Sequence, residues 1–303
     1  MATASKAEPA ELLAAAHERG DQRHEPEMGA VCAAARETVR VSVPAAEARL
    51  ALKVAFWRGV IGQLPAEDLV DLAVEALVAG LEGAALEALA GASLRDSRAL
   101  WDLWQEVVAE QGFESVDDQA ALWGLVRHTA LQVVNGSLDP NLAAAWLWRS
   151  ASWRLEPEGD LRVFVGLASV VEDHPELQGS LAAKVVEECR SLLARPGPRR
   201  WLRLQASQHS LLSLSTNMGP LPLAIAELGL PEDLRARLGD WQLQWRATVD
   251  AGGFASADAA ERFVAAGAGL ATALQYFLGP SWNVEYYPEA TRPPGLQLRP
   301  TAR

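Results

Sequence analysis

Residues 195–217 read RPGPRRWLRLQASQHSLLSLSTN, and the hydrophobic pattern of the chain changes within this stretch. Before it, apolar residues recur every three to four positions, which indicates amphipathic helices. Inside it, apolar and polar residues alternate from Leu202 to Ala206 and again from Leu212 to Thr216, which indicates two strands. The Pro-Gly-Pro cluster at 196–198 separates the two patterns and is typical of a domain boundary.

The residues before this boundary predict helices only. First-turn prolines, capping side chains and helix-stopping glycines divide residues 44–195 into an acidic all-α domain. Ser93 and Ser115 are predicted N-caps within it, and Asp139 is predicted to cap a Trp-rich helix. The predicted helices cover residues 45–61, 65–80, 84–90, 93–111, 115–135, 141–153, 160–172 and 175–194. Residues 1–43 are predicted to hold N-terminal helices that are partly loose.

The residues after the boundary predict a small α+β module at 199–287. Its predicted order is ββααβ: a hairpin at 201–216, two helices that begin near Pro231 and Ser256, and a last strand at 282–286. Three strands make a small sheet, so we expect an edge that is open to pairing. Residues 288–303 are proline-rich and are predicted to be a disordered tail. The predicted fold is therefore mostly α, with an N-terminal all-helical domain followed by a small C-terminal α+β module.

The formal net charge of −12 is concentrated in the first part of the chain. Residues 1–195 carry 30 acidic and 17 basic side chains, whereas residues 196–303 carry 9 and 10. A negative field repels nucleic-acid backbones and anionic membranes and favours basic partners. We therefore expect no nucleic acid and no membrane among the partners, and we expect a basic protein as the partner. The alternative interpretation is that the acidity only keeps the protein in solution.

The predicted cellular location rests on three further features of the sequence. No apolar run approaches the roughly 18 residues that a membrane-spanning helix needs. The first residues contain Lys6 and Glu8 and lack the apolar core of a secretory leader. Cys32 and Cys189 lie far apart, which does not fit a disulfide framework or a zinc site with Cys-x-x-Cys spacing. The predicted location is the cytoplasm.

The sequence contains few residues arranged for catalysis, and we expect no cofactor, no metal and no catalytic residue. Residues 172–176 (EDHPE) are the densest group of titratable side chains and could bind a divalent ion. Adjacent residues on a turn do not converge on one point, however, so we interpret this group as a solvated turn between helices. His209 lies in a serine-rich run, but no G-x-S-x-G motif accompanies it. No glycine-rich phosphate-binding loop is present in the sequence.

The tryptophans suggest a binding surface. The chain has eleven, and three of them, Trp146, Trp148 and Trp153, fall on the predicted helix 141–153. Positions with this spacing cannot all face one core, so at least one should lie at a surface or groove. Tryptophan is enriched at binding hot spots. The candidate partner-binding residues are Trp146, Trp148, Trp153, Asp139, Glu172 and Asp173. The alternative is that this helix is buried on two sides.

In the helical part, the segments 64–91, 134–140, 164–169 and 172–176 carry recognisable motifs. Those of the C-terminal module include Gly219-Pro-Leu-Pro-Leu223, Trp241, Leu278-Gly-Pro280 and Trp282-Asn-Val-Glu-Tyr286. These segments resemble uncharacterised proteins of high-GC bacteria that are similar to immunity or accessory proteins of toxin systems. In the relatives, an aromatic and acidic pair precedes the Gly-Pro, whereas here residues 214–217 are Leu-Ser-Thr-Asn. This difference argues against placing a site there. The resemblance carries over no catalytic residue, because the families have no established chemistry.

These features favour a non-enzymatic protein-binding protein, and specifically an immunity-type inhibitor of a basic partner. One alternative is an enzyme of unfamiliar class, with a pocket among the helices near residues 146–153 and carboxylates such as Asp139 or Asp173. Another is a regulatory scaffold in which the helical domain and the C-terminal module act independently. A large apolar cavity with convergent acids would favour the enzyme.

Overall fold

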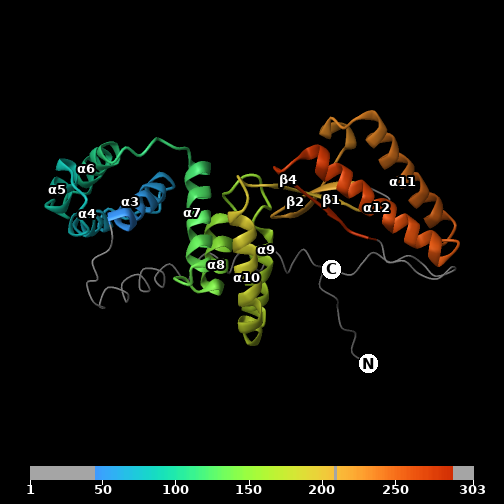
Figure 1. Cartoon of the computed structure of the whole chain (residues 1–303), viewed down its shortest axis with the longest axis horizontal. Helices are drawn as coiled ribbons and strands as arrows, with labels where there is room; N and C mark the ends of the chain where they lie inside the picture. The colour runs from blue at the N-terminus through green and yellow to red at the C-terminus, as the bar shows by residue number, and fades with distance from the viewer. Residues whose placement is uncertain (1–44, 208–209, 289–303) are drawn as a thin grey trace, which may run out of the picture. The chain divides into compact units, whose positions relative to one another are not determined.

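The structure is a computed structural model that describes residues 45–207 and 210–288 (Figure 1). The chain divides into two units at Pro44, and all described residues belong to the second, Ala45–Arg303. The helices predicted in residues 1–43, the tail predicted beyond Pro288 and His209 therefore lie outside the described residues. Below, residues 45–195 are called the helical part and residues 199–287 the C-terminal module.

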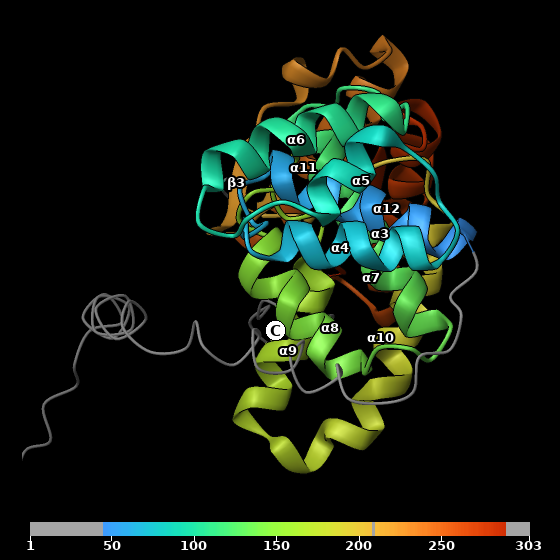
Figure 2. The ribbon, with the colours of Figure 1, turned by 90° about the vertical axis from the view of Figure 1, so that its left-hand side faces the viewer.

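The helical part contains the predicted succession of helices, which Figure 2 shows with the first described helices facing the viewer. Their bounds are α3 (Ala45–Val60), α4 (Asp68–Val78), α5 (Ala84–Ala90), α6 (Ser97–Glu110), α7 (Asp118–Val134), α8 (Pro140–Trp146), the π-helical turn η2 (Leu147–Ala151), α9 (Arg162–Asp173), the 3-10 turn η3 (Pro175–Leu177) and α10 (Gln178–Leu193).

Two separate apolar cores support these helices. One lies among α3, α4, α5 and α6 and has the fully buried Trp104 near its centre. The other lies among α7, α8, α9 and α10, and Cys189 is one of its buried members. Trp57 and Val60 of α3 pack against both cores. The last turn of α3 therefore links the two helical groups.

Several helix ends differ from the prediction by a few residues. Asp96 caps α6 and Asp117 caps α7, each by accepting a hydrogen bond from the backbone N–H three residues later, so the predictions of Ser93 and Ser115 were wrong. An Asp carboxylate nearer the helix competes successfully with an earlier serine. The helix predicted at 141–153 is α-helical only to Trp146 and then widens into η2.

The C-terminal module is built on a four-stranded sheet of order β3-β2-β1-β4. The strands are β1 (Arg200–Leu204), β2 (Leu212–Thr216), β3 (Gly219–Leu223) and β4 (Trp282–Tyr286). Strand β1 is antiparallel to β2 and parallel to β4. The predicted fold class is confirmed, with one strand more than the pattern indicated. Pro220 and Pro222 hid β3, because proline is depleted in strands.

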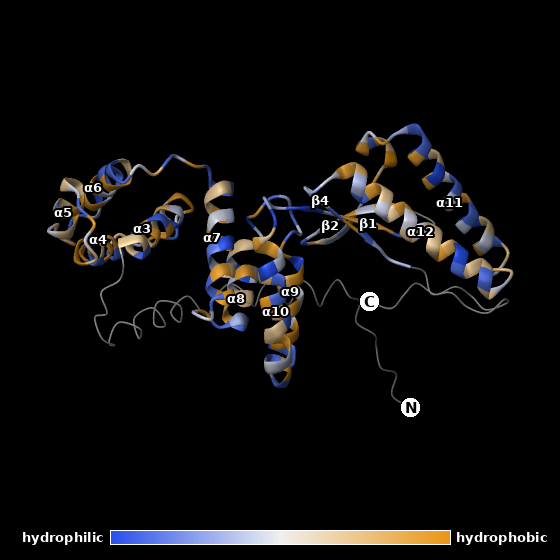
Figure 3. Ribbon diagram, viewed as in Figure 1, coloured by the Kyte–Doolittle hydropathy of each residue, from blue (hydrophilic) through white to orange (hydrophobic). Residues whose placement is uncertain are grey.

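Two long helices cover one face of this sheet, after the short turn η4 (Ile225–Leu228). They are α11 (Glu232–Asp250) and α12 (Ala257–Leu278), and α11 carries more hydrophilic side chains than α12 (Figure 3). Trp241 stacks on Phe263 with ring centroids 4.7 Å apart. A Cβ on Gly267 would lie 2.5 Å from the Tyr286 ring, so only glycine admits this packing. Residues 196–199 join α10 to β1, and the domain boundary placed there stays a prediction.

Candidate functional site

Strand alternation divides the side chains of the sheet between its two faces. Leu202 and Leu204 of β1 point into the core under α11 and α12. Trp201 and Arg203 therefore point to the opposite face. In the parallel register, Trp201 lies opposite Asn283 and Arg203 lies opposite Glu285 of β4. The face away from the helices is thus polar and aromatic.

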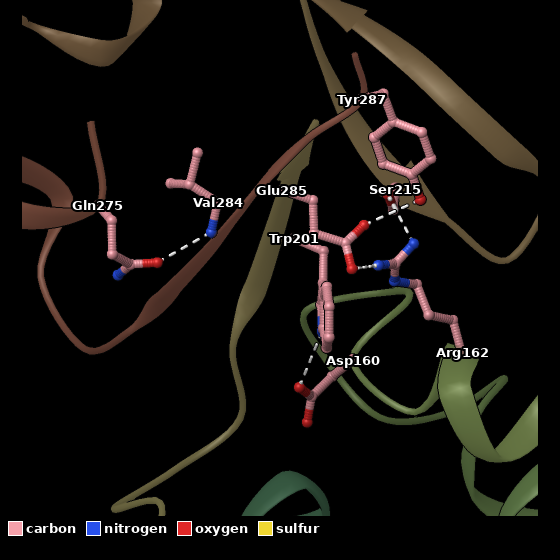
Figure 4. Close-up of polar contacts among 8 residues, drawn as sticks. All are labelled: Asp160, Arg162, Trp201, Ser215, Gln275, Val284, Glu285 and Tyr287. Atoms are coloured by element: carbon pink, nitrogen blue, oxygen red, sulfur yellow. Dashed lines mark hydrogen bonds and ion pairs between the residues drawn. The ribbon is translucent and has the colours of Figure 1, made fainter. Parts of the chain in front are cut away.

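A network centred on Arg162 connects this polar face to the helical part (Figure 4). Arg162, the first residue of α9, forms an ion pair with Glu285 and donates a hydrogen bond to Ser215 Oγ at 3.4 Å. Its guanidinium carbon also lies 4.0 Å from the centroid of the Trp201 ring. Tyr287 Oη donates to Glu285 at 3.0 Å, so the carboxylate has two partners. We call these contacts the Arg162 network.

A buried ion pair lies beside the network. Arg195 Nη1 donates to Asp160 Oδ1 at 2.5 Å, with side-chain exposures of 7% and 1%. The indole N–H of Trp201 donates to the same oxygen at 3.4 Å. Burial raises the pKa of Asp160, while the charge and hydrogen bond of Arg195 act in the opposite direction. Removing one member would leave a buried charge without its partner, which typically destabilises a fold strongly.

A cavity of about 50 Å³ is lined by this pair together with Glu188, Arg199 and Trp201. Burial, followed by the charge of Glu187, raises the pKa of Glu188. Perturbed acids in a cavity can indicate a catalytic site. Ligand pockets, however, typically enclose about 300 Å³ or more. The cavity at Asp160 has room for water molecules and not for a substrate.

A wider groove of about 320 Å³ lies among α3, α4 and α7. Its ionisable lining residues are Glu47, Arg58 and His128, and Arg58 already donates to the Gln63 carbonyl at 3.0 Å. Burial lowers the pKa of His128. Neither this groove nor the small cavity is lined by the tryptophans or carboxylates that the sequence singled out. The geometry of these two spaces does not support the alternative of a catalytic pocket near residues 146–153.

Both edges of the sheet are closed to a further strand. Proline has no N–H, so Pro220 and Pro222 leave the outer side of β3 without donors at two positions. At the opposite edge, Gln275 of α12 occupies the outer side of β4 (Figure 4). Its side-chain oxygen accepts from Val284 N–H at 2.9 Å, and its nitrogen donates to the Trp282 carbonyl at 3.0 Å. The sequence predicted an edge open to pairing. In the structure, the prolines of β3 and the side chain of Gln275 oppose pairing at the two edges instead.

Some of the predicted partner-binding residues lie together. Arg149 forms an ion pair with Glu172 at 3.2 Å, and its guanidinium carbon lies 5.7 Å from the centroid of the Trp148 ring. Trp146 and Trp148 are half-buried against the core of α7–α10. The cluster of Trp148, Arg149 and Glu172 is exposed to solvent on its charged side. Its binding role stays a prediction.

The other predicted residues lie in different settings. Asp139 caps α8, because its carboxylate accepts from the N–H groups of Asn141 and Leu142. Asp173 is the exposed last residue of α9. Trp153 follows η2 and is 56% exposed. This agrees with the prediction that at least one of the three tryptophans lies at a surface. The role of these three residues in binding also stays a prediction.

Sequence reasoning missed Arg162, Trp201 and Glu285. The signal for two of them was present, because the alternation that defines β1 and β4 places Trp201 and Glu285 on the face opposite the leucines. Arg162 carried no such signal. It was placed inside a predicted helix, and its hydrogen-bond and ion-pair partners, Ser215 and Glu285, lie more than 50 positions away.

The described residues, 45–207 and 210–288, lack two further kinds of feature, a metal-binding group and a membrane-spanning helix. They contain no group of three or more His, Cys, Asp or Glu side chains that could hold a metal ion. Within the same ranges, no helix is both long and apolar enough to cross a membrane. Cys189 is buried, and burial raises the pKa of its thiol to about 12.

Part of the chain matches a known family. Residues 200–289 match the family model described as Serratia CdiI immunity protein-like. The matched region contains all four strands together with α11 and α12, and it covers less than a third of the chain. The resemblance of this region to immunity proteins of toxin systems is confirmed. No curated protein matches the chain.

Proposed function

We propose that this chain is an immunity-type protein that binds a protein toxin and blocks it without catalysing a reaction. The observation that carries the proposal is the match of residues 200–289 to the immunity protein-like family. Within the matched region, one apolar core joins the four strands to α11 and α12.

The charge of the chain supports a basic toxin as the partner. Residues 45–195 carry 23 acidic and 12 basic side chains, so the helical part keeps the negative balance of residues 1–195. Opposite charges on two proteins raise the association rate, and this effect weakens as salt screens the field. Rapid capture is useful to an inhibitor that must act before its target does.

The test uses the protein encoded by the gene next to the one for this chain. That protein is expressed in a bacterial host alone and together with this chain, and growth is measured. We expect growth arrest when the neighbour is alone and recovery when both are present. The purified pair should form a complex of defined stoichiometry on size-exclusion chromatography, and its dissociation constant should rise as the salt concentration rises.

Two results would contradict the proposal. If the neighbouring protein is harmless and does not bind this chain, it is not the toxin that the proposal requires. A toxic neighbour whose product is chemically altered by this chain would replace inhibition by binding with an enzymatic activity. Mass spectrometry of the neighbour after incubation with the chain distinguishes this second case.

A further inference from the structure

Two segments that are distant in sequence lie side by side at the junction of the helical part and the C-terminal module. Asn217 Nδ2 donates to the Ser152 carbonyl at 2.7 Å. Gly159 approaches β2 so closely that a Cβ there would lie 2.2 Å from the Ser215 carbonyl oxygen. Residues 152–159 therefore run along residues 215–217. The Arg162 network holds the same junction three residues further on.

This junction displays two large apolar side chains at the surface. Met218, at the tip of the β2–β3 hairpin, is 84% exposed, and Trp153 is 56% exposed. They adjoin the hydrogen bond described above, because each immediately follows one of its two residues, Asn217 and Ser152. Trp and Met are enriched in protein interfaces, and Trp is frequent at hot spots. Neither side chain contributes to a core of the described residues.

The charges around these two residues are negative on balance. Glu156 and Glu158 are exposed on the same segment, and neither forms an ion pair with another described residue. Two cations lie nearby. Arg154 donates to the Ile61 carbonyl at 3.0 Å, and Arg162 is paired with Glu285. Arg154 keeps its positive charge, because the carbonyl that it contacts is neutral, so the two glutamates leave a net negative charge beside the apolar pair.

We propose that Trp153, Glu156, Glu158 and Met218 form one composite surface that binds a basic segment of the protein partner carrying an apolar side chain. This inference rests on the proposed function and names the part of the chain that performs it. Charge complementarity selects the basic segment, and Trp153 with Met218 receives its apolar residue. The partner docks through side chains, because Pro220, Pro222 and Gln275 close both sheet edges to strand addition.

The test measures the affinity and kinetics of binding to the neighbour-encoded protein for the full chain and its variants. W153A and M218A should each raise the dissociation constant about tenfold or more, as truncations of central apolar contacts do. Glu156→Gln with Glu158→Gln should lower the association rate a few-fold and flatten its salt dependence. The matched controls are Tyr276→Ala, at a residue 91% exposed on α12, and Asp102→Asn with Glu106→Gln on exposed positions of α6. These controls should change binding less than twofold.

A charge-introducing variant keeps the test decisive. Met218→Arg lies on a two-residue loop outside the strand pairs and should fold normally, which the far-ultraviolet circular dichroism and unfolding midpoint would verify. Against a basic partner it should weaken binding more than M218A does. Wild-type affinity for W153A, M218A and Met218→Arg would overturn the composite surface while leaving the proposed function intact. A wild-type chain that neither binds nor protects would overturn the proposed function itself.

Discussion

At the scale of single residues, Gly159 shows how closely the two parts of the chain approach. Its φ of +82° is a conformation that only glycine adopts readily, and its missing Cβ makes room for the Ser215 carbonyl. We expect Gly159→Ala to lower the free energy of unfolding by more than the roughly 1–2 kcal/mol that backbone strain alone costs. Urea unfolding measures the difference.

Gly136→Ala is the matched control for this prediction. Gly136 has a similar φ of +76°, but nothing lies within 4 Å of its Cβ position. This variant should show the cost of the backbone conformation alone. Equal losses in the two variants would mean that the Ser215 carbonyl can move away from residue 159, and that the contact is looser than the structure indicates.

Cys189 should be inert in the folded protein. Its thiol is buried in the core of α7–α10, and burial raises its pKa to about 12, so almost none is thiolate at neutral pH. In a Cys32→Ser variant, a thiol reagent at pH 8 should label position 189 only after denaturant is added. Rapid labelling of the native protein would show that α10 opens readily.

His128 should make stability depend on pH. Burial lowers its pKa below 6.5, so below pH 6.5 the unfolded chain takes up a proton that the folded chain resists. The stability of the fold is therefore unaffected by His128 above pH 6.5. It decreases as the pH falls from 6.5 towards the lowered pKa of the folded state. Urea unfolding at pH 8 and pH 5 should show a smaller loss for His128→Gln than for the wild type.

At the scale of elements, the edge of β4 depends on one side chain. Gln275 makes hydrogen bonds to Gly279, Trp282 and Val284, each worth about 1 kcal/mol in a typical protein. We expect Gln275→Leu to destabilise the module and to expose backbone groups of β4 to pairing with a second copy. Analytical ultracentrifugation should then detect concentration-dependent self-association.

Gln244→Leu provides the comparison for this variant. It adds the same leucine at an exposed position of α11, away from any strand. Self-association of both variants would point to general stickiness, whereas self-association of Gln275→Leu alone would locate the effect at the β4 edge.

The elements themselves were largely predictable from the sequence, for identifiable reasons. Helix α5 was predicted at its observed bounds, since Gly83 and Gly91 enclose it, and the alternation of Trp282, Val284 and Tyr286 predicted β4. Strand β3 was missed because its two prolines argue against a strand. They are tolerated there because the outer side of an edge strand needs no N–H. The local sequence pattern does not show that β3 lies at the edge of the sheet, because this position depends on the tertiary fold.

At the scale of the whole molecule, the Arg162 network should couple the helical part to the C-terminal module. Arg162 and Glu285 are only 22% and 29% exposed, so their interaction is less screened than a surface pair. In a double-mutant cycle with Arg162→Met and Glu285→Gln, we expect a coupling energy of about 1 kcal/mol or more in the free energy of unfolding.

The ion pair of Arg235 with Glu232 is the control for this cycle. It lies on the exposed surface of α11 at i,i+3 spacing, where the coupling should be close to zero. A coupling between Arg162 and Glu285 no larger than that of this surface pair would mean that the two parts are held together by other contacts.

The candidate site was less predictable than the fold. The sequence pointed to Trp153 as a surface residue, and the structure places it beside the hairpin tip at Met218. Nothing local linked the two, because the connection runs through Asn217 and Ser152, which are 65 positions apart. Periodicity locates side chains on an element, whereas a site made by two elements depends on how they pack.

The hydrogen bond from Asn217 to the Ser152 carbonyl has a consequence for diversification. It uses the main chain of residue 152 as acceptor, so the identity of the side chains displayed on either side does not affect it. We therefore expect the fold to tolerate joint randomisation of positions 153, 156, 158 and 218 in a display library. Selection from such a library would yield relatives of this chain with redirected recognition, obtained without rebuilding a single strand.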